Sequence, residues 1–294
     1  MYIDALYARM GDPNGNYMRD FQGTGFNARL FELACFAYLE SAGFEIDRSF
    51  PAPDFIAERN GVTIAFEAVT VNPSEGNDLD ISLLPLLRST EPSIPLDVTI
   101  RTTMLRISRA LRKKLAHRYD QLSHCKGKPL VLMVAPFSEP GSVFYPDGCL
   151  IENLYGTPQN WPKTENILPF FCLDNSTPIS SILYCNPFTV SRFIRFATDF
   201  RSSQNLIATR EGQCFFRDDD LASSFVHHLG ATQTPMETWH EGVTLFCNPF
   251  ASVSIPEGLL PNTCTFSINE DKLLRKIEKF HPVHSITRVQ VRNI

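Results

Sequence analysis

The sequence lacks several features that would indicate a secreted, membrane or disulfide-rich protein. Its 8 cysteines are scattered and form no Cys-x-x-Cys pair, so we interpret them as reduced core thiols and not as a disulfide framework or a zinc cluster. No segment approaches the ~18 consecutive apolar residues of a membrane helix. The first residues also lack the basic and apolar regions of a secretory signal. We therefore expect a cytoplasmic protein that contacts no membrane.

Motifs for nucleotide or zinc binding are missing as well. No glycine-rich stretch resembles a phosphate-binding loop. The pairs His227-His228 and His281-Pro-Val-His284 have no cysteine or acid at ligand spacing, so we interpret them as surface or structural histidines. The chain also has only 2 tryptophans, few for the stacking platforms of a sugar-binding cleft.

The composition nevertheless supports a large folded core. Of the 294 residues, 43% are hydrophobic and 23 are phenylalanine, which suits one large domain or two small ones. The net charge of −5 argues against general attraction of the whole surface to nucleic acid. The segment from Thr99 to Lys128 differs, because it carries nine basic residues and one acid, Asp120. This segment indicates either a local phosphate-binding face or an ordinary solvated helix face.

The residues from Pro53 to Thr70 predict a β-hairpin. Asn60-Gly61 separates two apolar, β-branched runs, which is the strongest short-range hairpin signal. With these two residues as the turn, residues whose numbers sum to 121 lie opposite one another, so Asp54 faces Glu67. Directly opposed side chains lie about 5 Å apart at Cβ, where like charges repel. The pairing predicts a site for a cation or a shared proton. The alternative is a pair of solvated strand-end acids or a different register.

Side-chain alternation places these two acids on a mostly apolar face of the hairpin. The residues expected on that face are Ile56, Ala65 and Val69, while Phe55, Ile64 and Phe66 point to the other face. Buried carboxylates without partners are costly. A divalent cation would relieve both the burial cost and the mutual repulsion. Mg²⁺, or Mn²⁺ in its place, suits this position because it takes one or two carboxylates and completes its coordination with water and phosphate.

A third acid, Glu32, lies in a helix expected over Ala28–Ala42. Asn27 is its expected N-cap and Gly43 its stop, and the helix is apolar on nearly every side, which indicates burial. A glutamate in such a helix is either paired internally, with Arg29 or with the basic segment, or it completes or orients the metal site.

Further elements follow from periodicity and turn signals. Segments 11–25 and 72–95 are expected as loops, the second with a short turn of helix near Leu83. The other expected elements are a strand over Phe44–Asp47, a helix over Arg101–Ser123, a strand over Pro129–Pro136, strands near Ile182–Cys185 and Val243–Cys247, and a helix over Asn269–Lys279. Asn-Pro-Phe follows each of the two later strands, and we interpret it as a turn that ends the strand.

These elements resemble the PD-(D/E)xK nuclease superfamily, whose restriction-endonuclease-like core runs α-β-β-β-α-β. Pro53-Asp54 matches the first part of its signature, Glu67 matches the second acid, and Glu32 matches a glutamate common on the first helix. The similarity covers roughly residues 20–137. The segment Phe66-Glu67-Ala68-Val69-Thr70-Val71-Asn72-Pro73 also resembles an uncharacterised bacterial branch with a longer C-terminal half. The resemblance implies an α/β (α+β) fold with a central mixed sheet flanked by helices.

The sequence departs from the family signature at the lysine. Val69 stands two residues after Glu67, where the family has lysine. Some members of the superfamily supply the lysine from the helix after the hairpin, and here that helix offers Lys113 and Lys114. We favour Lys114, because Leu111 and Leu115 anchor its side of the helix to the core. Lys113 is the second choice, and the alternative is that both lysines are merely solvated.

The expected function is a metal-dependent nuclease that hydrolyses phosphodiester bonds, with DNA favoured over RNA on the resemblance alone. Asp54 and Glu67 hold Mg²⁺ or Mn²⁺ with help from Glu32, and Lys114 positions the attacking water. The residues expected to contact phosphates are Arg109, Arg112, Lys113 and Arg118. The first alternative is an inactive nucleic-acid-binding or scaffold protein on a nuclease-like fold, motivated by the missing lysine. The second is a retaining glycoside hydrolase that uses two closely spaced carboxylates.

The domain prediction divides the chain at residue 140. Residues 1–140 form the nuclease-like core, and residues 141–294 form an α+β extension that either packs on the same sheet or recognises a substrate or protein partner. A homodimer is a further partner prediction. The sequence gives no signal that chooses among these roles.

Overall fold

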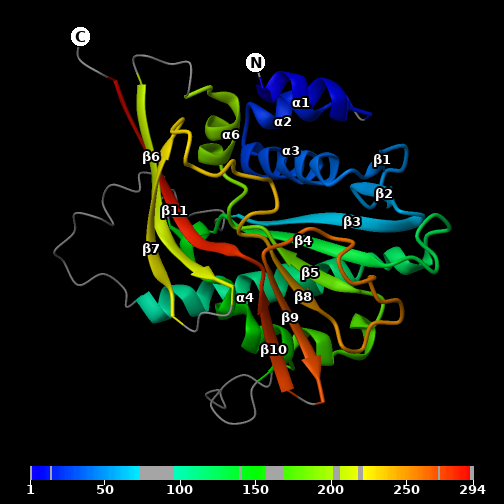
Figure 1. Cartoon of the computed structure of the whole chain (residues 1–294). Coiled ribbons are helices and arrows are strands. Elements are labelled where there is room, and N and C mark those ends of the chain that lie inside the picture. The colour runs from blue at the N-terminus through cyan, green and yellow to red at the C-terminus, as the bar shows by residue number, and fades with distance from the viewer. Residues whose placement is uncertain are drawn as a thin grey trace.

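A computed structural model shows two β-sheets, the larger of which is covered by helices on both faces. The helices of the N-terminal segment lie above the large sheet in Figure 1 and α4 lies below it, while the smaller sheet stands to one side. The structure describes residues 2–13, 15–72, 96–138, 141–156, 168–200, 206–217, 221–270 and 272–291.

Six α-helices lie in the described part of the chain. They are α1 (Tyr2–Met10), α2 (Tyr17–Phe21), α3 (Phe26–Ser41), α4 (Leu96–Leu115), α5 (Ile151–Tyr155) and α6 (Val190–Ala197). Short 3₁₀ turns connect several of them: η1 (Tyr119–Gln121), η2 (Ser142–Phe144), η3 (Asp147–Leu150), η4 (Phe170–Cys172) and η5 (Asp174–Ser176).

The large sheet is mixed and has the strand order β1-β2-β3-β4-β5-β8-β9-β10. Its strands are β1 (Glu45–Asp47), β2 (Phe55–Arg59), β3 (Val62–Val71), β4 (Leu130–Pro136), β5 (Ser181–Tyr184), β8 (Thr244–Cys247), β9 (Cys264–Asn269) and β10 (Lys272–Ile277). Strands β3, β4 and β5 are parallel to one another, and the flanking hairpins are antiparallel. Strands from both halves of the chain therefore lie in one sheet, which is consistent with the mixed sheet expected from the sequence.

The smaller sheet is antiparallel, with the order β11-β6-β7. Its strands are β6 (Leu206–Phe216), β7 (Ser223–Leu229) and β11 (Phe280–Val291). The register of β11 shifts between Pro282 and His284. Gly212 lies opposite this bulge, and a Cβ atom there would come within 2.1 Å of the His284 carbonyl oxygen. Only glycine permits this approach of the two backbones.

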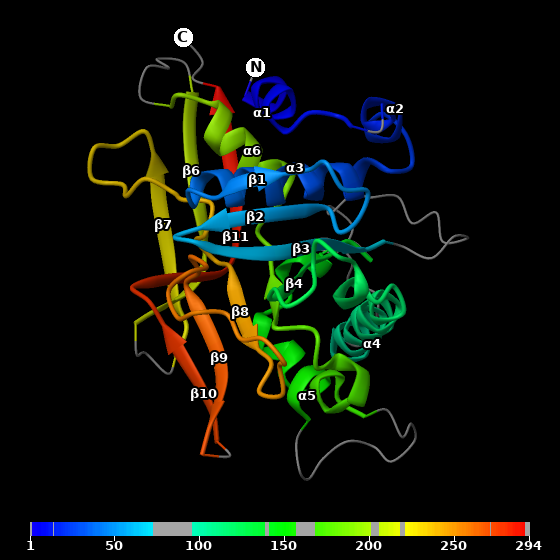
Figure 2. The ribbon, with the colours of Figure 1, turned by 90° about the vertical axis from the view of Figure 1, so that its right-hand side faces the viewer.

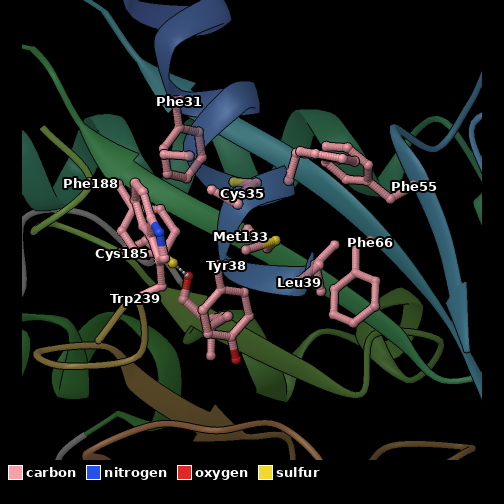
Figure 3. Packing of buried hydrophobic residues seen from close by; sticks show 14 of the residues in the cluster. Phe31, Cys35, Tyr38, Leu39, Phe55, Phe66, Met133, Cys185, Phe188 and Trp239 are labelled. Atoms are coloured by element: carbon pink, nitrogen blue, oxygen red, sulfur yellow. Dashed lines mark hydrogen bonds between the residues drawn. The ribbon is translucent and has the colours of Figure 1, made fainter. Parts of the chain in front are cut away.

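The large sheet separates two hydrophobic clusters. One cluster joins α1, α3 and α6 to the sheet, and the other joins α4 and α5 to its opposite face. Figure 2 shows α3 and α4 on the two sides of β3. In the first cluster, side chains of α3 such as Phe31 and Tyr38 pack beside Phe66, Phe188 and Trp239 (Figure 3).

The N-terminal expectations agree with this fold. Every residue from 30 to 39 of α3 is buried, as its apolar composition indicated, and Gly43 follows the helix with φ +79°. The helix begins earlier than expected, however, so Asn27 is inside it and Gly25 is the N-cap. A short helix, α2, also lies in segment 11–25, where a loop was expected. The expected loop over 72–95, with its turn near Leu83, falls almost wholly outside the described residues.

The buried strand β4 and the two later strands, β5 and β8, are also confirmed. Asn186 and Asn248 end β5 and β8, and each Asn Nδ2 donates hydrogen bonds to two backbone carbonyl groups. The turn interpretation is confirmed, because Phe188 N–H donates to the Cys185 carbonyl at 3.1 Å and Ala251 N–H donates to the Asn248 carbonyl at 3.3 Å.

The prediction of a helix over Asn269–Lys279 is wrong. Strands β9 and β10 occupy this segment and pair antiparallel over six residues each. Glu270 has φ +48°, a left-handed conformation that begins the reversal between the strands. Lysine, leucine and arginine suit a helix, but pairing with β9 overrides this weak local preference.

The basic helix is also shorter than expected. α4 ends at Leu115 and not at Ser123, because Arg118 adopts φ +48° and starts the 3₁₀ turn η1. This turn brings Tyr119 into the core, where it is 4% exposed. No helix in the described part of the chain is long and apolar enough to cross a membrane.

Candidate functional site

The turn of the β2–β3 hairpin fixes the position of the two acids. Asn60 and Gly61 have φ of 55° and 77°, the positive angles that a two-residue hairpin turn requires. The register pairs Phe55 with Phe66 and continues to the turn, as the sum rule predicted. Asp54 immediately precedes β2, at the position facing Glu67 of β3.

Asp54 and Glu67 are held together by hydrogen bonds at the end of this ladder. The backbone N–H of Asp54 donates to Oε2 of Glu67 at 3.2 Å. The backbone N–H of Ala68 donates to Oδ2 of Asp54 at 2.8 Å. Each carboxylate therefore accepts a backbone hydrogen bond from the other strand, which fixes both side chains at one place.

The positive charge near Asp54 does not balance the negative charges around it. Burial, followed by the negative charges of Glu67 and Glu32, raises the pKa of Asp54 from 3.8 to about 7. The Ala68 hydrogen bond and the charge of Lys114 oppose this shift without cancelling it. At neutral pH the site is thus close to taking up or releasing one proton, and a nearby cation would favour release.

Lys114 reaches these acids from α4. Its Nζ lies 2.5 Å from Oε1 of Glu67, while Leu111 and Leu115 are buried against the sheet. Lys113 is exposed. Val69 lies on the same face of β3 as Glu67 and packs in the hydrophobic cluster of α4. Of the two candidate lysines, Lys114 therefore has the contact that a site lysine needs.

Tyr119 is a neighbour of Glu67 that the sequence reasoning missed. Burial, then the charge of Glu67 and a hydrogen bond to it, raises the pKa of the Tyr119 hydroxyl. The expected helix over Arg101–Ser123 concealed this residue, because a continuous helix gives no reason for Tyr119 to turn inward. The sequence did offer one signal for burial of Tyr119, namely a large aromatic ring within a segment of basic residues.

Glu32 adopts the internal pairing that was the alternative to a metal role. Its carboxylate accepts a hydrogen bond from Arg29 at 2.8 Å and a second from Arg48. α3, which carries Glu32, packs on the opposite face of the sheet from α4. Among the described residues, the only three metal-ligating side chains with ligand atoms within 4.8 Å of one another are Asp147, Cys264 and His281. Glu32 therefore does not join Asp54 and Glu67 as a third ligand in this geometry, although its charge acts on Asp54.

The expected phosphate-contacting residues differ in exposure. Arg109, Lys113 and Arg118 are exposed, and Arg118 forms a 3.3 Å ion pair with Asp120. Arg112 is only partly exposed, and its Nη2 donates to the Leu168 carbonyl oxygen. Arg109 and Lys113 are one helical turn apart and so present their charges on one face of α4.

Asp147, Cys264 and His281 lie close together although they are far apart in the sequence. His281 is 2% exposed, so of the two roles expected for it, surface or structural, the structural one agrees with the fold. Although burial opposes it, the hydrogen bond and charge of His281 lower the pKa of Asp147 to about 2. The three residues are far apart in the sequence, so no local spacing signal existed.

A separate cluster of buried charges lies between α6 and the smaller sheet. Glu237 accepts hydrogen bonds from Arg192 at 2.9 Å and Arg195 at 2.6 Å, and Arg210 pairs with Glu241. Burial opposes ionisation of Glu237, but the charge of Arg192 and the hydrogen bonds from Arg195 hold its pKa well below its usual range. A cavity of about 370 Å³ lies beside this cluster, and none of the expected site residues lines it.

Comparison with known proteins adds no relative, since no family model, curated protein or solved structure matches the chain.

Proposed function

We propose that this chain is a Mg²⁺-dependent nuclease whose site is built from Asp54, Glu67 and Lys114. The observation that carries the proposal is the geometry that holds Asp54, Glu67 and Lys114 together, and the raised pKa of Asp54 supports it. Perturbed acids of this kind are concentrated at functional sites. The order of elements from α3 to β4 supports a nuclease-like core.

The two carboxylates fit a magnesium ion by their chemistry. Both are hard oxygen donors, and together they carry more negative charge than Lys114 offsets. Asp54 and Glu67 would hold the ion, which when bound supplies positive charge for a phosphodiester that becomes more negative in the transition state. The same charge removes the repulsion between the acids.

Lys114 contributes a positioned proton donor. Its ammonium group, fixed by Glu67, presents donors to a substrate oxygen or to the attacking water. Supply of this group from α4 would compensate for Val69, which occupies the position of the family's lysine. Tyr119 positions Glu67 from the other side.

The exposed face of α4 supports a nucleic-acid substrate. Arg109 and Lys113 lie on the helix that also carries Lys114. Contacts from these side chains to successive phosphates would place a phosphodiester near the acids without reading base sequence. We favour DNA over RNA only because the elements resemble the PD-(D/E)xK nuclease core.

A cleavage assay tests the proposal. The purified chain is incubated with supercoiled plasmid, linear duplex, single-stranded DNA and RNA, each with Mg²⁺, Mn²⁺ or a chelator. We expect cleavage that requires metal and that is lost in Glu67→Ala and Lys114→Ala. Lys272→Ala, at an exposed lysine of β10, and Glu58→Ala, at an exposed position of the same hairpin, are the controls, and both should retain cleavage.

Two results would contradict the nuclease proposal. The first is cleavage that persists in Glu67→Ala, which would indicate a contaminant or a different site. The second is binding of nucleic acid without cleavage under any of the metal conditions. The second result would favour the inactive binding protein, for which the valine at position 69 is the supporting observation.

A further inference from the structure

Three side chains that suit zinc meet where the two sheets join. His281 is in β11 of the smaller sheet, Cys264 begins β9 of the large sheet, and Asp147 begins η3. One ligand atom from each lies within 4.8 Å of the others. This group is separate from the hairpin acids and is not part of the proposed nuclease site.

The spacing is compatible with metal coordination as well as with the direct contact between His281 and Asp147. Nε2 of His281 is 3.3 Å from Oδ2 of Asp147. A charge-assisted hydrogen bond between these atoms would be about 2.7–2.9 Å long. Two ligand atoms bound to one tetrahedral zinc ion, each about 2.0–2.1 Å from it, are roughly 3.3 Å apart. The Cys-His-Asp donor set is also one that zinc accepts.

Hydrogen bonds orient two of the three ligand groups, His281 and Asp147. Nδ1 of His281 lies 2.8 Å from the Thr263 hydroxyl, which leaves Nε2 to face the site. Oδ1 of Asp147 accepts the Gly148 N–H at 2.8 Å. Such contacts set the tautomer and direction of metal ligands.

The position of the group defines its role. Side chains of His281 and Cys264 are 2% and 1% exposed, and Asp147 is 9% exposed, so a substrate has no access. The Thr244 hydroxyl donates to Oδ2 of Asp147 at 2.6 Å and holds this carboxylate in place. An ion here would connect β11 of the smaller sheet to β9 of the large sheet and to η3.

We propose that Asp147, Cys264 and His281 form a structural Zn²⁺ site that fastens the smaller sheet to the large one. The ion contributes to stability and not to phosphodiester cleavage, because it binds the folded arrangement and not the unfolded chain.

Metal content tests the proposal on the full chain. Protein purified from zinc-supplemented cells should retain about one zinc ion per chain by elemental analysis. Replacement by Co²⁺ should produce the near-ultraviolet charge-transfer band of a cobalt–thiolate bond. Cys264→Ala should lose the band and the zinc, whereas Cys185→Ala, a matched change at another buried cysteine, should lose neither.

Thermal unfolding keeps the test informative if Cys264→Ala folds poorly. A strong chelator should lower the Tm of the wild-type chain by several degrees, and added Zn²⁺ should restore it. Wild-type protein that retains no zinc, gives no cobalt–thiolate band and has the same Tm with and without chelator would overturn the proposal. The group would then be a purely hydrogen-bonded contact between sheets. Neither readout depends on cleavage, so the nuclease proposal can fail while this one stands.

Discussion

Two buried groups of charges in this protein are compensated in opposite ways. At the hairpin, Asp54 and Glu67 face the single ammonium of Lys114, and the pKa of Asp54 is raised to about 7. Beside α6, Glu237 and Glu241 face three guanidinium groups, and the pKa of Glu237 is lowered. The first group has too little positive charge for its acids, and the second has more than enough.

The difference separates a site from a structural contact. A buried carboxylate with surplus positive partners is stable as it stands and gains nothing from a further cation. A buried carboxylate with too few partners is stabilised by a proton or by a metal ion. The direction of the pKa shift therefore separates these two groups, which burial of charge alone does not.

The largest expected effect is on stability at the compensated group. Glu237→Gln leaves Arg192, Arg195 and Arg210 without their shared carboxylate, which should lower the free energy of unfolding by about 3–5 kcal/mol. Denaturant unfolding monitored by circular dichroism measures this loss. A change below about 1 kcal/mol, the level of a surface ion pair, would show that the cluster is not the structural contact described here.

The next effect is on activity at the hairpin group. Lys114→Ala should lower the cleavage rate roughly 100-fold or more, the amount typical of a positioned proton-transfer group. The free energy of unfolding should also fall, because the side chain of Glu67 is only 8% exposed and loses its ammonium partner, so the rate is measured on protein that circular dichroism shows to be folded. Single-turnover cleavage of a labelled duplex gives the rate. Lys272→Ala, at an exposed lysine of β10, is the control, and an equal loss of rate in both variants would contradict a specific role for Lys114.

A smaller effect is expected from neutralising Asp54. Its folded pKa is raised, so the stability it contributes is fully present below about pH 4 and is lost as the pH rises through about 7. Asp54→Asn should therefore stabilise the metal-free chain by about 1–3 kcal/mol at pH 8, with a smaller gain at pH 5. Chelator-treated protein unfolded in denaturant at both pH values provides the measurement, with Glu58→Gln as the exposed control. Destabilisation by Asp54→Asn at pH 8 would contradict the charge balance proposed for the hairpin.

The smallest effect concerns the exposed face of α4. Arg109→Gln should weaken DNA binding about equally across sequences and reduce the slope of log affinity against log salt by about one. Arg9→Gln, in α1 on the opposite face of the large sheet, should leave the slope unchanged. Fluorescence anisotropy across a salt series tests both variants. The same slope for Arg109→Gln and wild type would place the nucleic acid elsewhere.

The positions of Asp54, Glu67 and Lys114 could be predicted from the sequence, because each follows from the turn or the periodicity of a single element. Asn60-Gly61 fixes the hairpin turn, and the turn fixes the register that brings Asp54 to Glu67. Helical periodicity then selects Lys114, because Leu111 and Leu115 show which side of α4 is buried. Each step uses residues close together in the chain.

The missed parts depend on contacts between distant segments. Arg48, which pairs with Glu32, comes from the loop after β1. The sequence of α3 does not predict this contact. Tyr119 reaches Glu67 because α4 ends at Leu115 and Arg118 starts the turn η1. His281 meets Asp147 and Cys264 through the arrangement of two sheets, which no spacing in the sequence encodes.

The most direct test of the account is calorimetric titration of Mg²⁺ into the wild-type chain, Asp54→Asn and Glu58→Gln near pH 8. The account predicts saturable binding to wild type and to Glu58→Gln, and none to Asp54→Asn. Equal binding to all three proteins, or no binding to wild type, would contradict the claim that the hairpin acids hold a cation.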